Sequence, residues 1–119
     1  MTDRQFDPQY RIRRRGDFRR AYSRRCSAAD GRLLVFGCEN GLPHPRLGLS
    51  VSRKVGTAVR RNRWKRLIRE AFRLRREDLP GGIDLVVIPR STEEPELAAL
   101  LSSLPGLARR VAARLARDR

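Results

Sequence analysis

Residues 61–73 of this 119-residue chain predict a helix that is apolar on one side and cationic on the other. When successive residues are placed about 100° apart, the apolar side chains fall on a single stripe: Trp64, Leu67, Ile68, Ala71 and Phe72. The rest of the helix carries Asn62 and several basic side chains, interrupted only by Glu70: Arg63, Lys65, Arg66, Arg69 and Arg73. The stripe requires another element to cover it. The single-sign face predicts a polyanionic partner, because like charges on one helix repel each other.

Basic residues dominate the composition, and they are concentrated in two parts of the chain. The net charge is +15, with 28 Lys and Arg against 13 Asp and Glu. Residues 46–76 contain twelve basic side chains and one acidic one, and residues 1–25 contain nine Arg and three Asp, whereas residues 77–104 are acidic. A chain of this length forms one domain. The uneven charge predicts a defined docking face for nucleic acid or another anionic surface.

Other classes of protein are disfavoured by the sequence. No segment has the roughly 18–20 apolar residues that a membrane-spanning helix needs, and the N-terminus lacks the apolar run of a secretory signal, so we expect a cytoplasmic protein. Cys26 and Cys38 have no CxxC spacing and are expected to be reduced. His44 is the only histidine, which disfavours a structural metal site. No group of acidic residues and histidine has the pattern of a general acid–base pair or a two-metal centre.

Periodicity and turn signals predict a helix, three strands, a helix, a strand and a final helix. These elements fall at residues 17–24, 26–29, 32–38, 46–53, 56–76, 83–89 and 97–115. The order predicts an α+β fold around a single small sheet. Residues 1–15 lack periodicity and are expected to form a basic, flexible segment ahead of a single domain over residues 16–119.

Two strands have patterns that bear on a binding site. Residues 32–38 are apolar on both faces, so both faces must be covered. Residues 46–53 alternate, with Leu47, Leu49 and Val51 on the inward face; the opposite face is small and polar and leaves room for a ligand: Gly48, Ser50 and Ser52.

The ends of the two flanking helices carry further signals. Asp17 is expected to cap the first helix, and the acidic residues 93–96 suit the start of the last one. Pro105-Gly106 predicts a kink in the last helix or its division into two short helices.

The stretch from Val51, VSRKVGTAVRRNRWKRLIREAFR, resembles the signature of the bacterial ribonuclease P protein family. The shared pattern is a strand ending in Ser and two basic residues, followed by Gly-x-Ala-Val-x-Arg-Asn-Arg-x-Lys-Arg-x-x-Arg-Glu-x-Phe-Arg. The resemblance includes Gly16-Asp17-Phe18 with Tyr22 four residues on, and it covers residues 11–104. Pro105-Gly106 departs from the continuous last helix of the family.

The resemblance implies that this chain is the RNA-binding protein subunit of ribonuclease P. Such a subunit assists a catalytic RNA that removes the 5′ leader of precursor tRNA. The catalytic centre would lie in the RNA, which uses Mg²⁺, and the protein would bind no cofactor tightly. The implied partners are the catalytic RNA and leader-bearing precursor tRNA, with neither DNA nor a membrane. The family also implies a left-handed strand–helix–strand crossover, although about 98% of such connections are right-handed.

Carried onto this sequence, the family's contacts with the catalytic RNA fall at the start of the long helix: Arg60, Arg61, Asn62, Arg63 and Arg66. Its contacts with the single-stranded leader fall in a cleft between sheet and helices: Phe18, Tyr22, Leu34, Phe36, Ser50, Ser52, Lys54, Lys65 and Arg69. Electrostatics supports the first set independently, because basic charge opposes the dipole at a helix N-terminus unless phosphate binds there. Aromatic rings spaced four residues apart offer planes on which unpaired bases can stack.

Simpler interpretations remain open at this stage. The two aromatic residues of the first helix could serve only to pack it on the sheet, Leu34 and Phe36 could be core alone, and the two serines could merely face solvent. At the level of function, one alternative is a structural protein that binds ribosomal RNA or a duplex without leader dependence. Another is a nuclease that acts without RNA.

Overall fold

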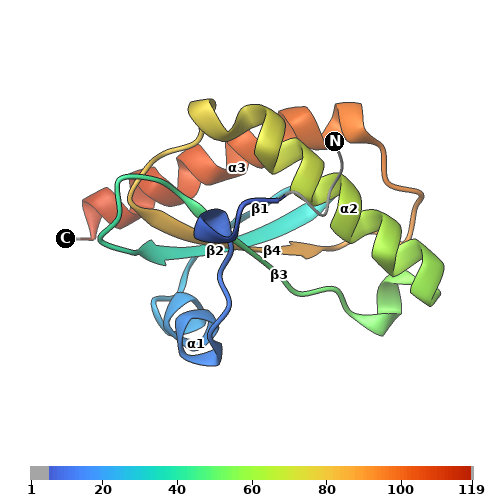
Figure 1. Cartoon of the computed structure of the whole chain (residues 1–119), viewed down its shortest axis with the longest axis horizontal. Helices are drawn as coiled ribbons and strands as arrows, with labels where there is room; N and C mark the ends of the chain where they lie inside the picture. The colour runs from blue at the N-terminus through green and yellow to red at the C-terminus, as the bar shows by residue number, and fades with distance from the viewer. Residues whose placement is uncertain (1–5, 119) are drawn as a thin grey trace.

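A four-stranded sheet in the order β1-β2-β4-β3 organises the molecule (Figure 1). The computed structural model describes residues 6–118. The main elements follow the predicted order: α1 (Arg15–Ser23), β1 (Cys26–Ala29), β2 (Leu33–Glu39), β3 (Arg46–Leu49), α2 (Ala58–Arg75), β4 (Ile83–Pro89) and α3 (Leu97–Arg117). Short 3-10 turns in the described residues lie between or before them: η2 (Pro8–Tyr10), η3 (Arg53–Val55) and η4 (Arg76–Asp78). The predicted α+β fold is confirmed.

The sheet is mixed. β2 pairs antiparallel with both β1 and β4, whereas β3 pairs parallel with β4. β3 and β4 are therefore neighbours joined by a crossover through α2, the connection that a parallel pair requires. The left hand of this crossover stays a prediction.

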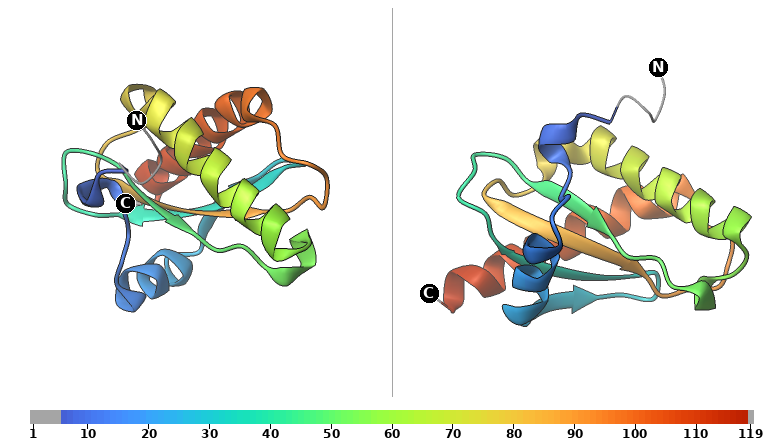
Figure 2. Two further views of the ribbon diagram at one scale, coloured as in Figure 1. Left: turned by 45° about the vertical axis from the view of Figure 1, so that its right-hand side comes forward. Right: turned by 60° about the horizontal axis from the view of Figure 1, so that its bottom comes forward.

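The two faces of the sheet are covered unequally. α2 and α3 lie together on one face, and α1 lies on the other (Figures 1 and 2). The larger core is between the sheet and the helix pair, and its biggest fully buried side chains include Trp64, Phe72, Leu33, Ile68, Leu85 and Leu100. A smaller cluster lies under α1, around Ile12, Ala21, Cys38 and Val86. Because nine-residue α1 spans only part of its face, that face stays partly open.

Strand alternation explains this division. Along β2, Leu33 and Val35 are buried against the helix pair, whereas Leu34 and Phe36 point to the α1 side and are only half-buried. β4 is almost wholly buried because it is a central strand with elements on both faces.

Part of the N-terminal segment packs onto the domain. The backbone N–H of Ile12 donates to the Leu47 carbonyl at 2.9 Å, and Phe6 and Ile12 are both buried. Phe6 also meets Phe72 of α2, with ring centroids 5.6 Å apart. Residues 6–14 thus contribute to both cores. The flexibility expected for residues 1–15 stays a prediction, and residues 1–5 lie outside the described part.

Two expected features of the N-terminal half are wrong in detail. Asp17 does not cap α1, because the helix begins two residues earlier, at Arg15; its carboxylate instead pairs with Arg20 and Arg46. The strand expected over residues 46–53 ends at Leu49, and Ser52 becomes the cap of η3, accepting a hydrogen bond from the Lys54 N–H at 3.0 Å.

The expected division of the last helix is also wrong, because α3 is one helix through Pro105. Proline at position 105 has no N–H to donate to the Leu101 carbonyl one turn earlier. Arg75 of α2 supplies the missing donor, with its Nε 3.3 Å from the Leu101 oxygen. The cost of proline within the helix is thereby offset by a contact from the neighbouring helix.

Both cysteines are free thiols and buried, as expected for a reduced pair. Within the described residues, no helix is both long enough and apolar enough to cross a membrane.

Candidate nucleic-acid interface

The connection from β3 to α2 is built from local caps. Gly56 adopts φ +144°, a conformation that L side chains rarely reach, and it lets the chain turn out of η3. Thr57 then caps α2, with its Oγ1 accepting from the Arg60 N–H at 3.2 Å. These caps fix where α2 begins and therefore where its first basic side chains stand.

The five residues predicted to contact the catalytic RNA do not share one surface. Arg60 and Arg63 lie on the flank that faces the loop before α3. Arg60 donates to the Thr92 carbonyl, and both guanidinium groups pair with the carboxylate of Glu94, the Arg60 contact at 3.6 Å. The acidic residue expected at the start of α3 therefore pairs with α2 instead, and Glu96 at the helix N-cap makes no side-chain capping bond.

Asn62 and Arg66 lie on the outer surface of α2 and are exposed. Arg61 lies between this surface and the core: its side chain is half-buried, and its Nε is buried with no hydrogen-bond partner among the described residues. An unsatisfied buried donor is costly, so Arg61 is placed to gain from an incoming acceptor.

Arg61, Lys65 and Arg69 form a cationic flank of α2 on the side opposite Arg60 and Arg63. Their spacing of four residues aligns them along the helix, and all three are half-buried. Arg69 lines a hollow of about 160 Å³ at the β3 edge of the sheet. We call this hollow, bounded by Phe18, Gly48, Leu49 and Arg69, the edge hollow. It brings together two residues, Phe18 and Arg69, that the sequence assigned to leader binding.

The open part of the sheet face continues from the edge hollow. Tyr22 of α1 meets Phe36 of β2 edge to face, with ring centroids 5.2 Å apart, and 37% of the Tyr22 surface is exposed. Leu34 and Ile88 are opposite each other in the β2–β4 register and are both half-buried. The result is an apolar, partly aromatic platform beside α1.

The remaining predicted leader contacts lie beyond β3. Ser50 follows the strand, donates its N–H to the Val87 carbonyl at 3.2 Å, and is half-buried. Ser52 is exposed, but its hydroxyl is engaged as the η3 cap, and Lys54 is exposed within η3. Of these three, Ser50 alone continues the small, polar sheet surface that the sequence predicts.

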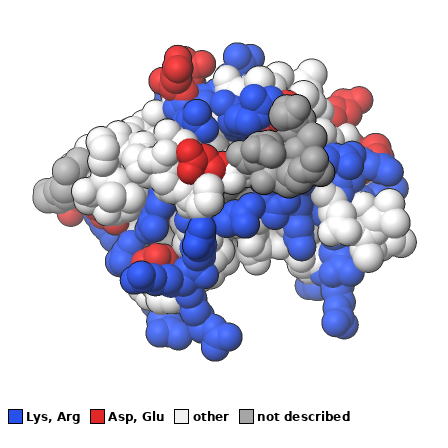
Figure 3. All heavy atoms as spheres, in the orientation of Figure 1, with Lys and Arg blue, Asp and Glu red and all other residues white. Residues whose placement is uncertain are grey.

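Basic side chains stand on both sides of this surface. In Figure 3, Lys and Arg gather over α1 and over the turn that starts α2, with a hollow between the two groups. This arrangement resembles an open channel with cationic rims and an apolar floor. Such a channel suits a single strand, because the rims can bind its phosphates and the floor can contact its unpaired bases.

The basic residues of α3 have a different role. Arg110 donates to the Ala29 carbonyl at 3.3 Å, and Arg114 donates to the Ser27 carbonyl. Ala29 and Ser27 belong to β1, one of the two edge strands of the sheet. The two arginines thus cover backbone acceptors that an exposed edge strand would otherwise offer to another chain.

A buried carboxylate that was not among the predicted site residues holds together the elements around the site. Asp84 of β4 is fully buried and accepts two hydrogen bonds from Arg46, at 2.8 and 2.7 Å, and one from Asn40 at 3.0 Å. These bonds raise the pKa of Arg46 above its usual value. Arg20 of α1 also approaches Asp84, at 3.5 Å, so the network ties α1 and the β2–β3 loop to the sheet. The sequence signal for this network is a single Asp within the otherwise apolar strand at residues 83–89, because a buried carboxylate requires a cationic or hydrogen-bonding partner.

Comparison with known proteins identifies the family. The ribonuclease P family model matches residues 6–112. The ribonuclease P protein component of Oleidesulfovibrio alaskensis is 46% identical over 92 residues, which cover 76% of this chain and 74% of the relative. The Thermotoga maritima component is 42% identical over 90 residues, 76% of each chain. The chain belongs to the ribonuclease P protein family.

Solved ribonuclease P proteins share the fold. A variant of the Staphylococcus aureus protein superposes with a TM-score of 0.77 at 34% identity, covering 88% of this chain and 90% of the other. The Thermotoga maritima protein gives a TM-score of 0.76 at 36% identity and covers 84% and 96%. The family match begins at Phe6, so it includes the N-terminal segment that packs against β3 and α2. Ribonuclease P is a tRNA-processing endonuclease, and members of this family are its protein component.

Proposed function

We propose that this chain binds the catalytic RNA of ribonuclease P and holds the single-stranded 5′ leader of precursor tRNA on the open face of its sheet. The observation that carries the proposal is the edge hollow, where Phe18 and Arg69 line one surface. A ring and a cation at one point match the two chemical parts of an unpaired nucleotide, its base and its phosphate.

In this proposal the leader runs between α1 and the cationic flank of α2. Its phosphates pair with Arg69, Lys65 and the Arg61 guanidinium, whose buried Nε gains an acceptor. Its bases stack on Phe18 and on the Tyr22–Phe36 pair, each worth about 1–3 kcal/mol. Leu34 and Ser50 supply the floor, while Ser52 and Lys54 mark the far end near η3. A base-paired strand cannot offer its base faces in this way, so the cleft favours single strands.

The catalytic RNA binds on the outer surface of α2. Asn62 and Arg66 are already exposed, and phosphate near the first turn of α2 is favoured by the helix dipole. Arg60 and Arg63 join this contact when phosphate replaces the Glu94 carboxylate. The two RNA surfaces therefore lie on different sides of one helix, which lets the protein hold both RNAs at once.

The chemistry belongs to the RNA and its Mg²⁺ in this proposal. The described residues offer no group of three or more His, Cys, Asp or Glu side chains arranged to hold a metal ion. The protein acts by neutralising phosphates, which lowers the Mg²⁺ concentration that the RNA needs, and by discriminating precursor from mature tRNA. This role places it in the cytoplasm, with no requirement for DNA or a membrane.

Reconstitution tests the proposal. The purified protein is mixed with a bacterial ribonuclease P RNA at low Mg²⁺, and cleavage of a leader-bearing precursor tRNA is measured beside each component alone. We expect stimulation in the mixture only, with cleavage at the mature 5′ end. Tight RNA binding without stimulation would favour a purely structural RNA-binding protein, and cleavage by the protein alone would contradict RNA catalysis.

A further inference from the structure

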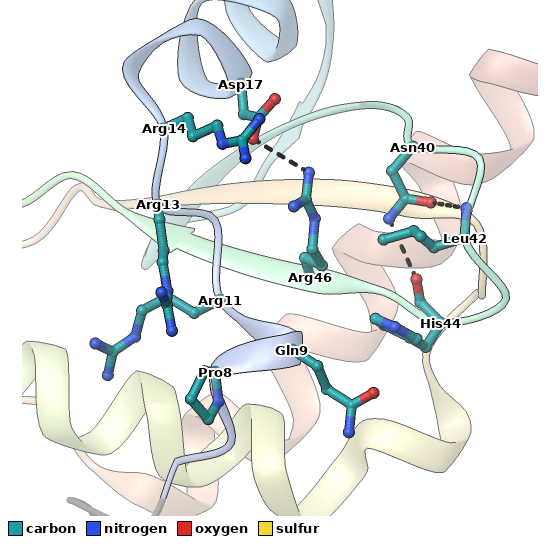
Figure 4. Close-up of a pocket in the computed structure, with 10 residues that line it drawn as sticks. All are labelled: Pro8, Gln9, Arg11, Arg13, Arg14, Asp17, Asn40, Leu42, His44 and Arg46. Atoms are coloured by element: carbon teal, nitrogen blue, oxygen red, sulfur yellow. Dashed lines mark hydrogen bonds and ion pairs between the residues drawn. The ribbon is translucent and has the colours of Figure 1, made fainter.

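A second cavity among the described residues lies outside the leader cleft. Its volume is about 530 Å³, within the range of about 300–1,000 Å³ that is usual for ligand sites. It is enclosed by the N-terminal segment, the start of α1 and the β2–β3 loop (Figure 4). Four arginines line it, against a single carboxylate, Asp17: Arg11, Arg13, Arg14 and Arg46.

The carboxylate is already engaged within the protein. One oxygen of Asp17 lies 3.2 Å from Arg20, and the other lies 3.5 Å from Arg46. Arg46 is in turn held by the buried Asp84 and reaches from β3 toward Asp17, as Figure 4 shows. On this side of the cavity, the charges of Asp17 and Arg46 are therefore balanced by partners within the protein, and both side chains are held in place.

Arg13 and Arg14 have no such partners. Neither side chain makes an ion pair or hydrogen bond with any other residue in the described part of the chain, and both residues are exposed. Their backbone is nevertheless held on both sides: Ile12 bonds to Leu47, and the Arg14 carbonyl accepts the Asp17 N–H at 3.0 Å. An anchored backbone segment thus carries two unpaired guanidinium groups beside the positive end of the α1 dipole, where an anion is favoured and further cations are not.

Arg11 connects this cavity to the edge hollow, because it lines both. A strand that leaves the edge hollow beside Phe18 can pass Arg11 and continue into the cavity. Guanidinium forks match phosphate oxygens in charge and geometry. We infer that the cavity is a second phosphodiester site, in which Arg13 and Arg14 bind phosphates of an RNA strand continuing from the leader cleft; this inference rests on the proposed function.

The test compares the double variant Arg13→Gln/Arg14→Gln with Arg109→Gln/Arg117→Gln. The control removes the same charge from exposed positions of α3 whose side chains make no hydrogen bond or ion pair within the described residues. Each reconstituted holoenzyme is titrated with precursor tRNA carrying a short leader, a leader of twice that length, or none, over a range of salt concentrations. Binding to the RNA subunit alone is measured in parallel, and melting confirms that each variant is folded.

We expect the double variant to lose roughly tenfold in affinity for the long-leader precursor and its salt slope to fall by about 1–2, relative to the control. Loss with the long leader only would support the inference. Equal loss for all three substrates, or loss in the RNA-subunit titration, would contradict it, because neither result depends on a strand that continues from the leader cleft. Affinity and slope equal to those of the control in every titration would overturn the inference. If the wild-type protein neither binds nor stimulates the RNA, the proposed function itself fails.

Discussion

Gly48 of β3 lies directly against the ring of Phe18: a Cβ at position 48 would stand 2.8 Å from Phe18 Cε1 and 2.9 Å from Cζ. Real Cβ atoms do not approach other atoms so closely, so only glycine allows the ring to rest on the strand there. This contact sets the depth of the edge hollow and the position of the ring that we propose for base stacking.

Gly48→Ala is therefore expected to displace Phe18. The overpacked contact should cost about 1–3 kcal/mol of unfolding free energy, and the preference of the holoenzyme for leader-bearing tRNA should fall. Denaturant unfolding and paired titrations with precursor and mature tRNA measure the two effects. Gly106→Ala is the control, since a Cβ there meets no atom within 4 Å, and alanine should stabilise α3 by about 0.5–1 kcal/mol. An unchanged leader preference in Gly48→Ala would argue against stacking on Phe18.

Glu94→Gln should strengthen association with the catalytic RNA. The carboxylate pairs with Arg60 and Arg63 in the free protein, so phosphate must displace it before both arginines are available. Removing its charge should raise affinity several-fold and steepen the salt dependence by up to about one unit. Stability should change by less than about 1 kcal/mol, because these ion pairs are solvent-exposed. Glu93→Gln, also exposed, controls for the general loss of negative charge; equal gains in both variants would contradict competition by Glu94.

Asp84→Asn should destabilise the fold. Arg46 would lose the charged half of a bidentate pair that joins edge strand β3 to central strand β4. Breaking a buried pair by removing one partner costs about 3–5 kcal/mol. Arg20→Gln is the matched comparison, because Arg20 approaches Asp84 only at 3.5 Å with half of its side chain exposed, and it should cost less than about 1 kcal/mol. Urea unfolding separates the two, and comparable losses would show that Arg46 is not the principal partner.

The two cysteines should react slowly with thiol reagents in the native protein. Burial raises the pKa of both Cys26 and Cys38, so little of the reactive thiolate forms near neutral pH. Alkylation at pH 8 should be slow in native protein and fast in denaturant, and it should accelerate as pH rises because deprotonation limits the reaction. Rapid labelling of either cysteine under native conditions would show that its part of the core opens readily.

The sequence predicts the elements whose pattern is local and repeated. The apolar stripe of α2 identifies the residues that become core, with Trp64, Ile68 and Phe72 all buried. Likewise, the strand predicted over residues 83–89 has the same bounds as β4, and its apolar residues after Asp84 are mostly buried. The family signature locates the basic start of α2. Phe18 and Arg69, two residues of the predicted leader set, line one hollow, and their role in leader binding stays a prediction.

The errors arise where a distant contact decides the outcome. In α3, Arg75 donates to the Leu101 carbonyl that Pro105 leaves without a backbone donor. This contact comes from α2, so the sequence of α3 alone does not predict it. Glu94 suits a helix start by sequence alone, yet it lies against α2 in the fold. The shorter β3, by contrast, has a local cause: the strand ends at Leu49, and Ser52 caps η3 through a hydrogen bond from the N–H two residues along the chain.

The separation of two RNA surfaces on α2 is the central claim, and leader discrimination tests it most directly. The measurement is the ratio of holoenzyme affinities for precursor and mature tRNA, together with affinity for the RNA subunit, in Phe18→Ala and in Arg63→Ala/Arg66→Ala. We predict that Phe18→Ala lowers the precursor-to-mature ratio about tenfold or more, the value of one stacked base, and leaves binding to the RNA subunit intact. The double arginine variant should weaken subunit binding strongly. Equal losses of both properties in both variants would contradict the claim.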